Sequence, residues 1–221
     1  MNISGTEDDT KIAIISVVLG LFALVVLSPT VGIILFAYGI TYAVLISRKP
    51  PFAYQFSRSP RNLMNLLGIP VAVFLVFVFV NDFIVGNFNF GSSLALYSSA
   101  LSPIITIDTP IVKFAIWGIL IPVLETFLFI GVVGFMLAKQ LKVTGLQTNR
   151  IDTYIIIAVV GAIAAVFHLV SQLTMPELLI MDMILFGAGM GLTLKYQELK
   201  QAAFLHIFVH SAAMLVLFGV I

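Results

Sequence analysis

Cysteine is absent from the 221-residue chain, and charged residues make up only 10% of it. Without a thiol the chain can form no disulfide, cysteine nucleophile, iron–sulfur ligand or lipid-modified cysteine. The low charge excludes a disordered chain and a coiled coil, because both need many more charged residues. The formal net charge is +1, so no electrostatic field favours nucleic acid as a partner.

Apolar residues take the place of the missing charge. They account for 61% of the chain, and the mean hydropathy is +1.15. A soluble domain averages about 45–50% apolar and about 25% charged residues, so this composition excludes an ordinary soluble protein. We therefore expect an all-α, polytopic membrane helix bundle, with the lipid bilayer as its surroundings. No internal repeat and no soluble domain is evident, which predicts a single membrane domain over residues 1–221.

Seven apolar segments approach the length of about 20 residues that is needed to cross a hydrocarbon core of about 30 Å. The segments are 12–27, 31–46, 63–80, 111–138, 154–173, 178–194 and 202–221. No small-residue cleavage site follows the first, so we expect it to be a retained helix. Residues 1–85 then form N-terminal helices, and residues 86–110 form an extracytoplasmic loop with a short surface helix. Residues 111–221 form the core of the domain.

Basic residues predict how the bundle is oriented. Lysine and arginine gather in three polar stretches, at 48–61, 139–150 and 195–200. With seven spans and a cytoplasmic N-terminus, all three stretches lie on the cytoplasmic side, as the positive-inside rule requires. We therefore expect an integral, multi-pass protein of the cell (plasma) membrane.

Few ionisable residues lie deep inside the predicted spans, and all three histidines are among them. The set is Glu125, His168, Asp182, His206 and His210. A charged side chain at the bilayer centre costs at least about 2.5–3.5 kcal/mol, so such residues normally face a partner or a cavity. Each is a candidate functional residue, although Asp182 fits no motif.

The residue types alone leave several chemistries open. His206 and His210 are four residues apart, so on a helix they share one face and can ligate one metal ion or donate to one oxyanion. Glu125 can act as a general base, and His168 is open to the same interpretation. One glutamate and three histidines also make a possible zinc ligand set. Alternatively, all four residues hydrogen-bond neighbouring helices and only hold the bundle together. His-Glu-x-x-His, Gly-x-Ser-x-Gly and Walker motifs are absent.

The order of these residues resembles the CPBP family of intramembrane proteases, which comprises the CAAX prenyl proteases and the bacteriocin-processing (Abi) proteins. The family's first motif is Glu-Glu-x-x-x-Arg; this chain keeps Glu125 but has Thr126 and Ile130 at the other two positions. The second motif, Phe-x-x-x-His, keeps only His168. The third is a histidine followed four residues later by asparagine or a similar residue, here His206 and then His210. The resemblance covers residues 111–217.

The resemblance implies a peptidase acting on a peptide or a membrane protein. Glu125 would deprotonate a water that His168 holds and polarises, while His206 and His210 would stabilise the oxyanion. It also favours this glutamate-and-water mechanism over zinc. Because Ile130 replaces a permanent cation, binding of a free C-terminal carboxylate, and so prenyl-protein cleavage, is disfavoured. The alternatives are an inactive membrane scaffold that binds a membrane-protein partner and, less favoured, a small proton-coupled transporter.

These residues lie at unequal depths in their spans. At about 1.5 Å per residue, Glu125 is about 21 Å from Lys139, and His168 is deeper still, whereas His206 is only about 9 Å from Lys200. The four side chains can meet only if the fourth and fifth spans project beyond the membrane on the cytoplasmic side.

Overall fold

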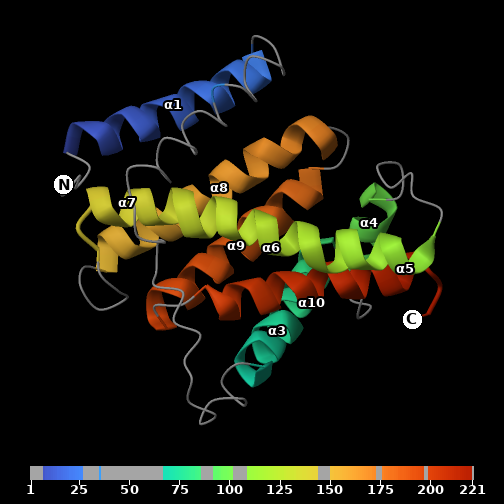
Figure 1. The fold of residues 1–221 in the computed structure, drawn as a ribbon. Helices are drawn as coiled ribbons and strands as arrows, with labels where there is room; N and C mark the ends of the chain where they lie inside the picture. Colours follow the sequence, from blue (N-terminus) through green and yellow to red (C-terminus); the bar gives the residue numbers. More distant parts are fainter. Residues whose placement is uncertain are drawn as a thin grey trace.

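The structure is a computed structural model that describes residues 7–26, 35, 67–85, 92–101, 109–143, 150–172, 176–196 and 199–220. Within these ranges the chain is almost entirely helical and contains no strand, which confirms the all-α prediction for them (Figure 1). The helices before the core are α1 (Glu7–Val26), α3 (Ile69–Val85) and α4 (Ser92–Leu101). The predicted span at 31–46 lies almost wholly outside the described residues.

Within the part of the chain that the structure describes, four helical segments are long and apolar enough to cross a membrane. They are Pro110–Gln140, Ile151–His168, Glu177–Tyr196 and Lys200–Leu217. Each coincides with one of the last four spans predicted from the sequence, and together they are typical of a membrane protein. Among the described residues α3 is a further apolar helix, but it is shorter, at 17 residues. The total of seven spans and the cytoplasmic N-terminus stay predictions.

The longest helical run covers residues 110–140 and alternates between α- and π-helical turns. Its parts are α5 (Pro110–Lys113), η3 (Phe114–Leu120), α6 (Ile121–Glu125), η4 (Thr126–Gly134) and α7 (Phe135–Gln140). The run is unbroken because the residues at its junctions all keep right-handed helical dihedral angles. It ends at Lys142, which adopts a left-handed conformation (φ 54°), while the Val143 N–H donates to the Ala138 carbonyl at 2.8 Å.

Small residues bring the remaining core helices close together. α8 (Arg150–Gln172) and α9 (Pro176–Tyr196) form an antiparallel pair that crosses at Gly161, where a Cβ atom would lie 2.4 Å from the Met183 carbonyl oxygen. Gly134 of the long run makes a similar contact, with the Met190 sulfur 2.5 Å from its Cβ position. Close approach of this kind is the usual way in which membrane helices pack.

α10 (Lys200–Leu217) lies antiparallel to the long run and beside it (Figure 1). Ser211 Oγ donates to the Gly118 carbonyl at 3.1 Å near one end, and Leu199 packs over Gly131 at the other. One apolar cluster joins the far end of the run to α1, α8 and α9, and a second joins α10 to α3, α4 and α9. Polar side chains from α6, α8, α9 and α10 lie between these two clusters.

The start of α10 explains how residues of unequal depth meet. α10 begins opposite Gly131, whereas the long run continues to Gln140, about 14 Å further along its axis. This extension packs against α1 and α8. The long run and α8 therefore project beyond the start of α10, as the depths of Glu125 and His168 in the sequence require.

The third helix ends later than the sequence predicts. The prediction ended the span before Asn81 and Asp82, because adjacent polar residues usually mark a loop, but α3 continues to Val85. Both side chains are buried: Asn81 donates to the main chain one turn earlier, and Asp82 accepts the Ser93 backbone N–H at 2.7 Å. The short helix predicted between 86 and 110 is present as α4, and it packs against α3 and α10 with Leu94 buried. The extracytoplasmic position of this segment stays a prediction.

Candidate active site

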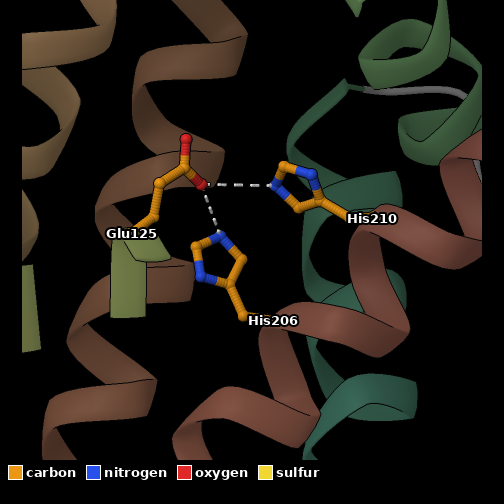
Figure 2. A group of neighbouring side chains, drawn as sticks. All are labelled: Glu125, His206 and His210. Carbon is orange, nitrogen blue, oxygen red and sulfur yellow. Dashed lines mark ion pairs between the residues drawn. The ribbon is translucent and has the colours of Figure 1, made fainter. Parts of the chain in front are cut away.

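The structure brings all four predicted site residues together around one carboxylate. Glu125 Oε1 lies 3.3 Å from His168 Nε2. Glu125 Oε2 lies 3.4 Å from His206 Nε2 and 3.8 Å from His210 Nε2 (Figure 2). Three elements that are far apart in the sequence, namely α6, α8 and α10, thus supply one polar cluster.

The local helical structure aims these side chains inward. His206 and His210 occupy successive turns on the buried face of α10, and their ring centroids are 4.8 Å apart. Phe186 of α9 packs edge-on against His206 at 4.6 Å and lies 5.7 Å from the His168 ring. Phe129, one turn after Glu125, lies 5.8 Å from the His168 ring and packs edge-on against Phe186 at 5.1 Å. The two phenylalanines therefore form one aromatic cluster against His168, and Phe186 extends it to His206.

His168 lies between two carboxylates. Its Nδ1 is 3.1 Å from Asp182 Oδ2, and its Nε2 faces Glu125 Oε1. Asp182 is fully buried in α9. The sequence marked Asp182 only as an ionisable residue at bilayer depth, and no motif assigned it a role. Its partner lies across the α8–α9 hairpin, so only the pairing of these two helices could have revealed the contact.

Thr126 is a second site residue whose role the sequence analysis missed. The resemblance treats it as the loss of a glutamate, but its buried Oγ1 lies 3.1 Å from His206 Nδ1. A hydroxyl both donates and accepts, so Thr126 can support either neutral tautomer of His206. Ile130, the other departure from the family motif, lies in the apolar cluster beside α8 and α9. No cation stands at that position.

His210 is oriented by the main chain. Its Nδ1 lies 3.1 Å from the Trp117 carbonyl oxygen, which can only accept, so Nδ1 must carry the hydrogen. In the neutral ring, Nε2 is then an acceptor, and it faces Glu125 Oε2. A hydrogen bond donated from Nε2 would need the doubly protonated ring.

The side of the carboxylate that faces α10 lacks hydrogen bonds. Glu125 Oε2 and His206 Nε2 are both buried, and neither has a hydrogen-bond partner in the part of the chain that the structure describes. Leaving a buried polar atom unpaired costs about 1–3 kcal/mol, and native structures rarely do so without a reason. The arrangement suits a polar ligand such as water, a substrate carbonyl or a cation.

The cluster borders the outer surface of the helix bundle. The Glu125 side chain is 20% exposed, and its neighbours Val123 and Leu124 are 39% and 52% exposed. Exposed aliphatic residues of this kind face lipid in a membrane protein, so the carboxylate is close to the lipid-facing surface.

Two chemical uses fit this geometry. The carboxylate can accept a proton from water, because Oε2 is an acceptor without a partner. Glu125, His206 and His210 can also each offer one ligand atom to a metal ion, since these atoms lie within 4.8 Å of one another.

Comparison of the chain with protein-family models, with curated proteins and with solved structures finds no match. The resemblance to CPBP proteases therefore rests on the motif residues alone.

Proposed function

We propose that this chain is an intramembrane peptidase of the CPBP type, which hydrolyses a bond in a peptide or a membrane protein. One observation carries the proposal: the four motif residues converge, yet the Oε2 side of Glu125 lacks hydrogen bonds. A scaffold that kept these residues only for stability would be expected to satisfy its buried polar atoms. Unpaired atoms that face one another favour a reactive centre.

In this mechanism Glu125 Oε2 takes a proton from a water molecule placed beside it. The water oxygen bonds to the substrate carbonyl carbon, and when the C–N bond breaks Glu125 returns the proton to the leaving nitrogen. His168 acts through Glu125, because its Nε2 faces Oε1 and its Nδ1 faces Asp182. His168 and Asp182 are thus positioning residues that keep the carboxylate aimed at α10.

His206 is the better placed oxyanion donor. If the Thr126 hydroxyl donates to Nδ1, then Nε2 carries a hydrogen that it can donate to the developing oxyanion. His210 could add a second hydrogen bond only in its doubly protonated form, because its Nδ1–H already points to the Trp117 carbonyl.

The proposal includes seven spans with a cytoplasmic N-terminus in the plasma membrane. It is supported by the antiparallel packing of α10 on the long run, which puts Lys139, near the end of that run, and Lys200 at the same end of the bundle. Two of the three basic stretches thus lie on one side, as a cytoplasmic face requires.

The test compares new protein N-termini in membranes of cells that express the wild type or Glu125→Gln, identified by mass spectrometry. We expect a set of cleavage sites that depends on the wild type and disappears in Glu125→Gln. Glu177→Gln is the matched control, because Glu177 lies at the start of α9 and outside the cluster. Identical N-termini in the wild type and Glu125→Gln would overturn the peptidase and favour the scaffold.

A further inference from the structure

Three ligand-type atoms meet on the side of the cluster that faces α10 (Figure 2). Glu125 Oε2 is 3.4 Å from His206 Nε2 and 3.8 Å from His210 Nε2, and one atom from each residue lies within 4.8 Å of the other two. The contact between Oε2 and His206 Nε2 is not a hydrogen bond, and neither atom bonds elsewhere among the described residues.

In one of the tautomers that their outer partners allow, both imidazoles present an Nε2 lone pair that a cation could accept. The Trp117 carbonyl fixes the hydrogen of His210 on Nδ1, which leaves a lone pair on Nε2 directed at an oxygen that also carries lone pairs. Thr126 Oγ1 can hold the hydrogen of His206 on Nδ1 in the same way. A metal-ligating histidine typically donates its other N–H to such an outer partner. Both α10 histidines have one.

We infer that Glu125, His206 and His210 bind one zinc-type divalent cation, with the fourth coordination position left for water or substrate. Zinc lies about 2.0–2.2 Å from its ligands, so tetrahedral ligand atoms are about 3.4 Å apart. An octahedral site of the same bond length would bring adjacent ligands to about 3.0 Å. The two separations from Glu125 Oε2, 3.4 and 3.8 Å, lie nearer the tetrahedral value. The three ligand atoms spread over up to 4.8 Å, and two zinc bonds span at most about 4.2 Å, so the side chains would close slightly around the ion.

His168 is outside this ligand set. Its Nε2 faces Oε1, the other oxygen of the carboxylate, and its Nδ1 faces Asp182. The four zinc ligands that the sequence allows are thus reduced to three. His168 instead contacts Oε1, the oxygen of Glu125 that does not bind the ion, and so orients the carboxylate, as outer partners of metal-ligating carboxylates do.

The inference that the chain binds an ion does not depend on the proposed peptidase. The use of the bound ion as a Lewis acid in hydrolysis does rest on that proposed function. With an ion bound, Glu125 Oε2 would be a ligand and not the base, and His206 and His210 would be ligands and not oxyanion donors. The ion would then activate the water and supply the positive charge that stabilises the oxyanion.

We expect no competing zinc site built from cysteine or histidine in a binding experiment, because the chain has no cysteine and its three histidines all lie in this cluster. The wild type, purified without a histidine tag and stripped with chelator, is titrated with Zn²⁺ by calorimetry. We expect one zinc per chain. His206→Gln and His210→Gln should each weaken binding by about 100-fold or more, since each removes a direct ligand. Glu177→Gln, which changes a carboxylate at the start of α9 and outside the cluster, is the matched control and should leave the affinity unchanged.

Thr126 provides a sharper test, because it touches His206 and not the ion. Thr126→Val removes the hydroxyl and should weaken zinc binding by about 10–100-fold, the usual effect of losing an outer partner. Thr126→Ser keeps the hydroxyl and should restore wild-type affinity. A purely structural role of Thr126 would change thermal stability without this pattern in affinity.

Co²⁺ provides a readout that needs only the wild type, in case the variants fold poorly. Intense visible absorption bands indicate four-coordinate Co²⁺, whereas weak bands indicate a six-coordinate ion, and Trp117 fluorescence reports folding. Absence of zinc binding by the folded wild type, binding that both α10 variants leave unchanged, or a six-coordinate spectrum would overturn the site. Chelator-resistant cleavage would leave the peptidase standing without the ion. Zinc binding without Glu125-dependent cleavage would support the ion site and overturn the peptidase.

Discussion

The two oxygens of the Glu125 carboxylate have contrasting surroundings. On the α8 side, Oε1 meets His168, whose second nitrogen is held by the buried Asp182. On the α10 side, Oε2 faces His206 Nε2 and His210 Nε2 without a hydrogen bond. On the α8 side both His168 nitrogens contact carboxylate oxygens, so this side serves to hold, although Asp182 Oδ1 has no hydrogen-bond partner among the described residues. On the α10 side two atoms without hydrogen-bond partners, Glu125 Oε2 and His206 Nε2, face each other, so it is where a ligand or a reaction would be accommodated.

The largest effect is expected from removing the group that both sides share. Glu125→Gln keeps the size of the side chain but removes the charge, and should lower peptide cleavage by about 10²–10⁴-fold, the typical contribution of a general base. The rate is measured on a substrate found by the N-terminal comparison. Retention of full activity would show that the α10 side performs no chemistry.

Asp182→Ala should disrupt the α8 side most. It leaves His168 without one of its two carboxylate partners in a buried position, and removing one member of a buried ion pair costs about 3–5 kcal/mol. Thermal unfolding of the purified protein measures the loss. Asp182→Asn is the milder companion, because its amide oxygen can still accept from Nδ1. Equal and small effects of both variants would mean that the α8 side contributes little to holding the bundle.

Gly161→Ala should strain the α8 side by pushing α8 and α9 apart. The added methyl group would meet the Met183 carbonyl, and overpacking of this kind costs about 1–3 kcal/mol. Gly187→Ala is the matched control in the same hairpin, since its Cβ would come no closer than 3.5 Å to a neighbour. We expect lower thermal stability in the first variant alone. A similar loss of stability in both variants would mean that the close contact at Gly161 matters no more than the looser one at Gly187.

Thr126→Val should have the smallest effect on stability. It removes one buried hydrogen bond to His206, and such bonds average about 0.6 kcal/mol between membrane helices. Its effect on zinc affinity should be much the larger of the two, which unfolding and calorimetry on the same preparation can separate. A loss of several kcal/mol in stability would instead place Thr126 among the residues that hold the fold.

The sequence predicts the core helices and four of the site residues for one physical reason. An ionisable side chain in an apolar helix is costly, so Glu125 and the three histidines stand out against their surroundings. The partners of these residues are harder to find. Thr126 is an unremarkable residue in an apolar run, and its role depends on how α10 lies against η4. Asp182 stood out but could not be paired, because the register between α8 and α9 is set by Gly161 and not by any local pattern.

The third helix shows the limit of the same reasoning. Asn81 and Asp82 predict a helix end because polar pairs usually meet water. Here the start of α4 supplies the Ser93 N–H and the Ser92 hydroxyl to Asp82, and Asn81 donates to the Phe77 carbonyl of its own helix. The helix continues to Val85. A contact made by a segment further along the chain cannot be anticipated from composition at the helix end.

The uneven ends of the core helices have a consequence for the lipid around them. Lys200 at the start of α10 favours the level of the headgroups, yet the residue before it, Leu199, packs over Gly131, well before the long run ends. In the orientation proposed above, lipids next to α10 would have to dip, which would thin the leaflet on that flank. His206, about 9 Å along α10 from Lys200, would then lie just under the membrane surface, with a short path for water to the carboxylate. A membrane-embedded substrate of the proposed peptidase would need to unwind only its end.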